Sequence, residues 1–70
     1  MNTQYYVDGG YIYGPHALTG YYIYSQYIYG PRGYTGFYRD GDYIYGPKGH
    51  TQFYFSEQHI YGPTNHLPWT

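Results

Sequence analysis

The sequence predicts an all-β fold, an antiparallel meander of about eight short strands made from hairpin repeats. Two observations predict it. The pentapeptide Tyr-Ile-Tyr-Gly-Pro begins at Tyr11, Tyr27 and Tyr43, and a fourth copy, His-Ile-Tyr-Gly-Pro, begins at His59, so that the copies start 16 residues apart. Each copy also carries two signals for chain reversal, and the segments between them are rich in Tyr, Ile, Phe and Thr, which favour strands. A fixed repeat is typical of architectures in which neighbouring units complete one another.

A single repeat domain, residues 1–70, accounts for the whole chain, because almost no residue lies outside the pattern. A chain of this length holds at most one small core. The leading residues resemble the end of an earlier unit, since Thr3-Gln4-Tyr5-Tyr6 parallels Thr51-Gln52-Phe53-Tyr54. The predicted units are 1–10 (partial), 11–26, 27–42, 43–58 and 59–70 (partial).

Each unit contains two kinds of turn signal. The first is Gly-Pro-x-Gly, as in Gly30-Pro31-Arg32-Gly33, in which proline presets φ and the later glycine can adopt a positive φ. In the last copy Asn65 replaces this glycine and tolerates the same conformation, whereas Ala17 in the first copy suits it less well. The second signal is a two-residue tip, and tips containing glycine favour primed hairpin turns. The tips are Gly9-Gly10, Ser25-Gln26, Gly41-Asp42 and Glu57-Gln58.

These turns predict a strand register. We assume a four-residue loop at 14–17 and a two-residue loop at 25–26. For each residue between them, the two loops then predict the same face of the sheet. A slip of one residue would have inverted the faces, so this agreement supports the hairpins. The predicted pairs are Tyr13 with Leu18, Ile12 with Thr19, Tyr11 with Gly20, Tyr24 with Tyr27, Ile23 with Ile28, and Tyr22 with Tyr29.

The register sorts the side chains into an aliphatic face and a tyrosine face. The apolar face carries Val7, Ile12, Ile23, Ile28, Phe37, Ile44, Phe53, Phe55, Ile60 and Leu67. The tyrosine face carries Tyr6, Tyr11, Tyr13, Tyr22, Tyr24, Tyr27, Tyr29, Tyr34, Tyr38, Tyr43, Tyr45, Tyr54 and Tyr61. We expect ring pairs across the strands, each contributing about 0.2–1 kcal/mol, and tyrosine rings that shield bare glycine backbone. These pairs are Tyr22 with Tyr29, Tyr38 with Tyr45, Tyr54 with Tyr61, Tyr11 with Gly20, and Tyr27 with Gly36.

A flat layer of this kind would expose its aliphatic face to water, so we expect the sheet to curl on itself or to dimerise. Arg39 interrupts this face opposite Ile44, where the sheet is either open or meets a partner. A short β-solenoid is the alternative, with one unit per coil and equivalent residues stacked about 4.8 Å apart. Hairpins are favoured because both turn signals reverse the chain and the register is self-consistent.

Composition narrows the classes of function. The chain has 15 tyrosines, three Lys+Arg, four Asp+Glu and a formal net charge of −1. So few basic residues are a poor footprint for nucleic acid. The absence of cysteine excludes disulfides and thiolate metal sites. No apolar run reaches membrane-spanning length, and MNTQYYVDGG has no signal-peptide pattern. We therefore expect a cytoplasmic protein that binds neither nucleic acid nor a membrane.

The chain offers little for catalysis. Its acidic residues, Asp8, Asp40, Asp42 and Glu57, fall in or beside the predicted tips, where turn formation explains them better than catalysis. No nucleophile motif or phosphate-binding loop is present. His59 and His66 could lie on adjacent strands, but polar substitution on the tyrosine face explains them better than metal binding. We expect no catalytic residue, no metal site, no cofactor and no enzymatic activity.

The stretch TGFYRDGDYIY, Thr35 to Tyr45, resembles the β-hairpin repeats of MORN proteins and of choline- or glucan-type cell-wall-binding modules. The pentapeptide itself is similar to that of small bacterial YIYGP-repeat proteins, to which no activity is attached. The resemblance implies a hairpin-repeat fold and transfers no functional residue to this chain. Trp69 is the only tryptophan, whereas the repeats of both named families use several.

Two functions follow from the two faces. The first is a structural, protein-interaction module that associates with a protein partner or with itself as a homo-oligomer. Its candidate interaction face is Ile12, Ile28, Phe37, Ile44, Phe53, Phe55 and Ile60. The alternative is a small-ligand or carbohydrate-binding module, because exposed rings stack on sugars and cations. Its candidate residues are Tyr11, Tyr13, Tyr27, Tyr29, Tyr43 and Tyr45.

Overall fold

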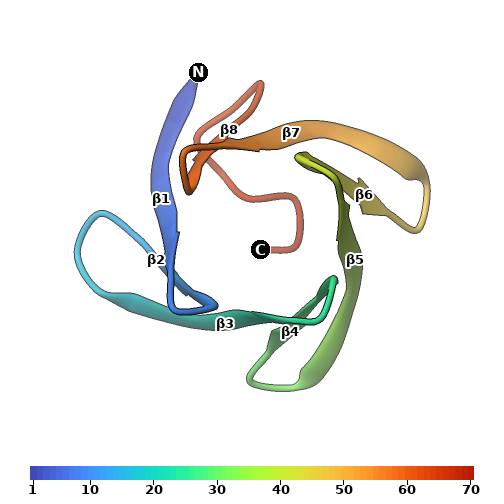
Figure 1. The fold of residues 1–70 in the computed structure, drawn as a ribbon, viewed down its shortest axis with the longest axis horizontal. Coiled ribbons are helices and arrows are strands. Elements are labelled where there is room, and N and C mark those ends of the chain that lie inside the picture. The colour runs from blue at the N-terminus through green and yellow to red at the C-terminus, as the bar shows by residue number, and fades with distance from the viewer.

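The chain is an all-β closed barrel in the computed structural model, which describes all 70 residues (Figure 1). Each strand pairs antiparallel with its neighbours in the sequence, and the last strand pairs with the first. No helix long and apolar enough to cross a membrane is present. The strands are β1 (Asn2–Asp8), β2 (Tyr11–Tyr13), β3 (Leu18–Tyr24), β4 (Tyr27–Gly30), β5 (Gly33–Asp40), β6 (Tyr43–Gly46), β7 (Gly49–Ser56) and β8 (His59–Tyr61).

The predicted all-β meander of eight strands is confirmed, and its closure into a barrel shows how the aliphatic face avoids water. The sheet curls through a full circle, so that no strand edge is left without a partner. The alternative solenoid is wrong, because equivalent strands such as β2 and β4 are separated by an antiparallel strand, β3, instead of stacking directly.

The two ends of the chain together form the fourth repeat. β8 supplies its first strand and β1 its second, with Tyr6 opposite His59. At this seam the Val7 N–H donates to the Gln58 carbonyl at 2.8 Å, just as the Ile23 N–H donates to the Gly10 carbonyl at 2.7 Å. The leading residues, predicted as the end of an earlier copy, thus complete the last one. Closure gives each of the four units a neighbour on both sides.

The register departs from the prediction at one place in each unit. Tyr13 pairs with Leu18 as predicted, and the pairs across the 25–26 tip are also confirmed. Tyr11, however, pairs with Tyr22 and not with Gly20, because Thr19, Gly20 and Tyr21 form a bulge opposite Ile12 alone. The bulge adds two residues, an even number, so the assignment of faces survives. The predicted pairing of Tyr27 with Gly36 is wrong for the same reason, since Tyr27 pairs with Tyr38.

A threonine hydroxyl supports each bulge. Thr35 Oγ1 donates a hydrogen bond to the Ile28 carbonyl at 2.7 Å and accepts one from the Phe37 N–H at 3.2 Å. Thr3, Thr19 and Thr51 make the same two bonds in the other units. The hydroxyl therefore supplies partners to backbone groups that the interrupted ladder leaves without one. This bond explains why every unit has threonine at the same position.

Replacing Thr35 by valine is expected to lower the free energy of unfolding by about 1–3 kcal/mol, because it leaves a carbonyl and an N–H without partners. Thr35→Ser keeps the hydroxyl and is the matched control, with an expected loss below about 1 kcal/mol. Urea denaturation followed by circular dichroism measures both variants. A valine variant as stable as the wild type would contradict this role for the hydroxyl.

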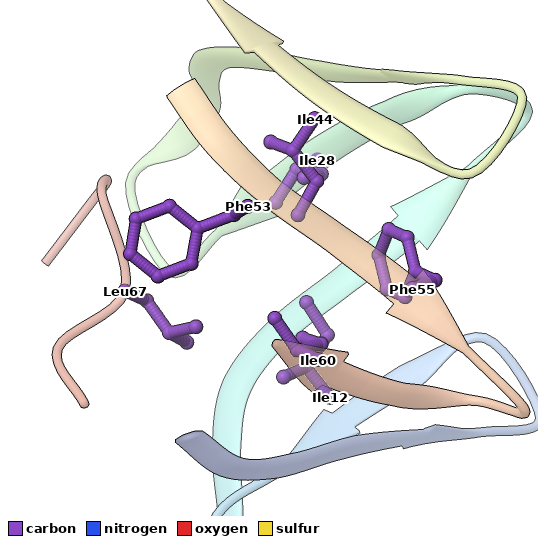
Figure 2. Close-up of a cluster of buried hydrophobic side chains, with 7 residues drawn as sticks. All are labelled: Ile12, Ile28, Ile44, Phe53, Phe55, Ile60 and Leu67. Atoms are coloured by element: carbon purple, nitrogen blue, oxygen red, sulfur yellow. The ribbon is translucent and has the colours of Figure 1, made fainter. Parts of the chain in front are cut away.

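The core is built from equivalent inward-facing positions of the four units. One isoleucine from each unit, Ile12, Ile28, Ile44 and Ile60, is completely buried at the centre. Phe53, Phe55 and Leu67 complete the buried cluster (Figure 2). Tyr5, Val7, Tyr21, Ile23 and Phe37 are half-buried and pack against it. The aliphatic face is therefore buried inside a single chain and not between two chains of a dimer.

The glycine of each pentapeptide makes room for an inward-facing ring. A methyl group added at Gly30 would lie 2.5 Å from Tyr21 Cε1, which is too close for a real contact. Phe37 covers Gly46, and Phe53 covers Gly62, in the same way. Rings therefore do shield glycines in this barrel, although with partners other than those predicted.

The C-terminal tail closes the Gly-Pro end of the barrel. After β8 the chain turns inward, and its end lies in the middle of the ring of strands (Figure 1). Leu67 is buried, and the Trp69 ring lies with its centroid 6.1 Å from that of Tyr21 and 5.9 Å from that of Phe37. The tail is not a strand, and its side chains cover the core at this end of the barrel.

Candidate binding surface

The residues of the predicted interaction face lie inside the barrel. Ile12, Ile28, Ile44, Ile60, Phe53 and Phe55 are buried, and Phe37 is half-buried against Trp69 of the tail. These side chains form the core, so no aliphatic sheet face is open to a partner.

The predicted tyrosine residues point outward. Tyr11, Tyr27 and Tyr43 are exposed, whereas Tyr13, Tyr29 and Tyr45 are half-buried because each stacks or packs against a neighbouring ring. Tyr5 and Tyr21, which were assigned to neither face, point inward. The remaining 13 tyrosines, those of the predicted tyrosine face, are called the outer tyrosine surface below.

The outer tyrosine surface is organised by ring stacking. Four stacked pairs, one per unit, have centroid separations of 5.4–5.7 Å and interplanar angles of 10–13°. Tilted contacts at 6.1–6.5 Å join one ring of three of these pairs to Tyr11, Tyr27 or Tyr43 across the bulged side of the units. The stacked pairs are Tyr6 with Tyr13, Tyr22 with Tyr29, Tyr38 with Tyr45, and Tyr54 with Tyr61. The rings therefore hold one another in fixed positions around the barrel while many of them remain accessible.

The densest part of this surface lies in the second unit, where Tyr27, Tyr29, Tyr34 and Tyr38 meet. Tyr34 packs edge-on against Tyr27 at 5.5 Å and is tilted against Tyr29 at 5.6 Å. We call these four residues the Tyr34 cluster. A shallow pocket of about 350 Å³ opens beside it. Leu18 occupies the position of Tyr34 in the first unit and His50 in the third, so only the second unit has four tyrosines here.

The Tyr34 hydroxyl has a raised pKa. Partial desolvation among the rings raises the pKa of Tyr34 above its ordinary value, and the negative charge that its three cluster partners would carry raises it further. An ordinary tyrosine is already protonated at neutral pH, so the shift extends the donor state of the hydroxyl further into the alkaline range. Its ring is still about half exposed, at 49%, so both its apolar face and its donor are available to a partner.

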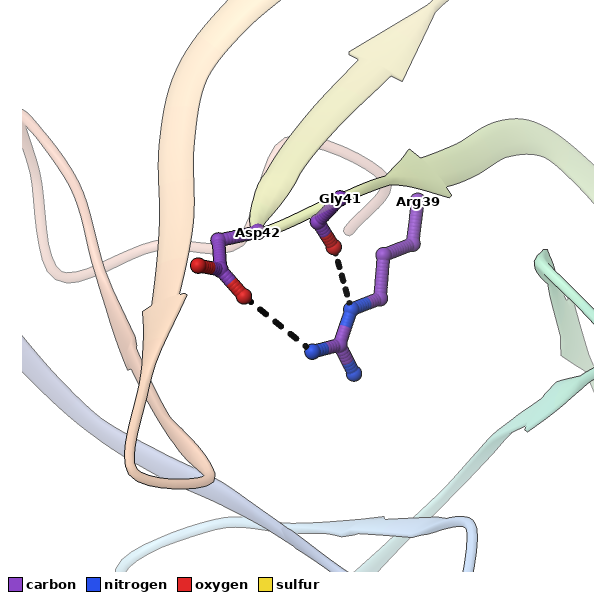
Figure 3. Close-up of polar contacts among 3 residues, drawn as sticks. All are labelled: Arg39, Gly41 and Asp42. Carbon is purple, nitrogen blue, oxygen red and sulfur yellow. Dashed lines mark hydrogen bonds and ion pairs between the residues drawn. The ribbon is translucent and has the colours of Figure 1, made fainter.

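Arg39 is the one charged residue on the inner face, and it pairs with Ile44 as predicted. Its guanidinium carbon lies 4.3 Å from the centroid of the Phe55 ring. Its Nε donates to the Gly41 carbonyl at 2.8 Å, and Nη2 lies 3.5 Å from Asp42 Oδ1 (Figure 3). Arg39 thus covers the core at the tip end and is held by its own hairpin turn.

The remaining polar candidates are dispersed. The acidic residues lie in or beside the tips, and His59 packs against Tyr6 with centroids 6.1 Å apart. No group of three or more His, Cys, Asp or Glu side chains is close enough together to hold a metal ion. The arrangement concentrates ring surfaces on the outside of the barrel.

Comparison of the chain with protein-family models, with characterised proteins and with solved structures finds no match.

Proposed function

We propose that the protein is a cytoplasmic, non-enzymatic interaction module that binds a protein partner, a second copy of the chain included, through its outer tyrosine surface. The observation that supports the proposal is the closure of the barrel, which buries the aliphatic residues and leaves nine tyrosines exposed. Tyrosine is enriched in protein interfaces because it offers a large, rigid contact area and a polar tip at low cost in conformational entropy.

The Tyr34 cluster is the proposed centre of this interface. Its rings are already fixed by one another, so little side-chain freedom is lost when a partner binds. The pocket beside the cluster can receive a partner side chain, and Gln26 and Asp40 in its lining provide polar contacts. Clusters of aromatic residues around such a pocket are typical of the residues that dominate binding energy.

Photo-crosslinking tests the proposal. The amino acid p-benzoylphenylalanine replaces Tyr34 in one variant and Leu18, the equivalent residue of the first unit, in the control. We expect defined covalent adducts from position 34 in cell extract, or a covalent dimer in purified protein, and few from position 18. Replacing Tyr27 and Tyr38 by serine should reduce the yield by roughly ten- to a hundredfold, as expected for the loss of central contacts. Equal labelling from both positions, or none, would contradict the proposal.

A second candidate function is the binding of a small ligand or carbohydrate. One observation favours it: two pockets, each with an aromatic wall, lie at equivalent places in the second and third units, and Tyr34 is the one residue they share with the Tyr34 cluster.

A further inference from the structure

The charged residues are segregated to the two ends of the barrel. All four acidic side chains, Asp8, Asp40, Asp42 and Glu57, lie at the tip end together with Arg39, which gives −4 + 1 = −3. Arg32 and Lys48 lie in the Gly-Pro loops at the opposite end of the strands, which gives +2 and accounts for the formal net charge of −1. The one ion pair joins Arg39 to Asp42. Arg32 and Lys48 are therefore free to meet an anion.

Two equivalent pockets open at this basic end. The first has a volume of about 480 Å³ and the second about 360 Å³. Seven residues line each, at positions 16 apart, and one residue of the tail completes the wall. Tyr21 and Arg32 of the first pocket correspond to Phe37 and Lys48 of the second, and the tail contributes Trp69 to the first and Pro68 to the second. The 16-residue repeat therefore gives the second and third units the same pocket lining.

Both pockets combine the same chemical elements. An aromatic ring, Tyr21 or Phe37, provides an apolar wall, and a single cation, Arg32 or Lys48, stands beside it. The glycine of the Gly-Pro-x-Gly turn leaves open space, since an added methyl group at Gly33 would meet no atom within 4 Å. No carboxylate lines either pocket. The surroundings therefore favour a ligand with one negative charge on an apolar ring-shaped body.

We propose that the two pockets bind acidic sugars, one carboxylated hexose in each. The C–H face of the sugar would pack on the aromatic wall, and its carboxylate would pair with Arg32 or Lys48 by charge-assisted hydrogen bonds. One cation per pocket matches one carboxylate per sugar. A nucleic acid is disfavoured because the chain has only three Lys+Arg in total, too few to neutralise a phosphate backbone.

The other two units lack the complete pocket. In the first unit the position of Arg32 is taken by His16, and Leu18 replaces the second aromatic residue. In the last unit the chain leaves the sheet after Tyr61 and forms the tail, and β1 supplies the second strand, so no Gly-Pro-x-Gly loop joins the two strands. Neighbouring pockets on two adjacent hairpins fit a polymer of acidic sugars better than a single free sugar, because two weak sites on one chain act together.

This inference rests on the second candidate function and uses the Gly-Pro end, so it can fail while the Tyr34 cluster still binds a protein. The probe is a trisaccharide of galacturonic acid, compared with its neutral methyl ester in a ¹H–¹⁵N NMR titration of the whole chain. We expect the acid to shift the amides of Gly30–Thr35 and Gly46–Thr51 with a Kd of about 1 mM or below. The ester should bind several-fold more weakly.

Replacing both Arg32 and Lys48 by alanine is expected to weaken binding of the acid by roughly tenfold, and raising the salt concentration should act in the same direction. The control replaces Asp40 by Asn and Glu57 by Gln, which changes the net charge by the same magnitude, with the opposite sign, at the opposite end of the barrel. It should leave the affinity within about twofold. Thermal unfolding of all variants confirms that they are folded.

Three results would overturn the proposal. They are equal binding of the acid and its ester, amide shifts that lie only outside the two loops, and no shift at a concentration of several millimolar. A short oligothymidylate that shifts the same amides at lower concentration would assign the pockets to single-stranded nucleic acid instead. A shift of the Tyr27 and Tyr38 amides alone would leave only the outer tyrosine surface as a binding site.

Discussion

Replacing Ile44 by aspartate is expected to unfold the barrel, not to release a folded monomer from an oligomer. Ile44 has no exposed surface and lies in the central cluster with Ile28 and Phe53 (Figure 2). A carboxylate at this position would be buried without a partner, which costs several kcal/mol. Domains of this size have a total free energy of unfolding of about 5–15 kcal/mol or less. Circular dichroism and sedimentation velocity should show an unfolded, expanded chain.

Two variants control this experiment. Ile44→Val removes one methyl group and should cost about 0.5–1.5 kcal/mol while the protein stays folded. Tyr43→Asp introduces the same charge at the neighbouring residue, which points outward and is exposed, so the fold should survive. A folded, monomeric Ile44→Asp variant would show that the aliphatic face lies at a surface between copies and would contradict its place in the core.

The assignment of faces could be predicted because it depends only on the alternation of side chains along a strand. The predicted faces are correct although the predicted register is wrong, because the bulge at Gly20 adds two residues and two is an even number. A glycine inside a strand is itself a signal for a bulge, and Gly20 and Gly36 both carry a positive φ, 92° and 90°. The equivalent Gln4 and Gln52 adopt φ of 70° and 71°. Glutamine rarely has a positive φ, so the sequence did not show that all four units contain the same bulge.

Closure could not be predicted from local patterns. Thr3-Gln4-Tyr5-Tyr6 matches the end of a repeat, but nothing in these residues says which end of the chain they join. That choice depends on how far the sheet curls with each unit, which is a property of the whole barrel. The same limit applies to the binding surfaces. Alternation alone predicted outward tyrosines, whereas the pockets also require Pro68 and Trp69 of a tail that has no counterpart in the repeat.

Deleting residues 1–8 is expected to abolish folding of the remaining chain. β1 hydrogen-bonds to both β2 and β8, and it supplies Thr3, Tyr5 and Val7 to the interior. Without it two strand edges lose their partners, and the buried Ile12 and Ile60 become accessible to water. The truncated chain should lose its dispersed NMR spectrum and its cooperative thermal transition.

A peptide of residues 1–10 added in trans should restore both signals as its concentration rises, because it can fill the gap between β2 and β8. A peptide with Val7→Asp, which places a charge against the core, is the matched control and should fail to restore them. The comparison separates closure by β1 from a general effect of added peptide. A truncated chain that keeps its cooperative transition at low concentration would show that three hairpins and the tail suffice. In that case the pairing of Tyr6 with His59 would close a barrel that is already stable without it. The presence of four repeats would then need an explanation other than closure of the barrel.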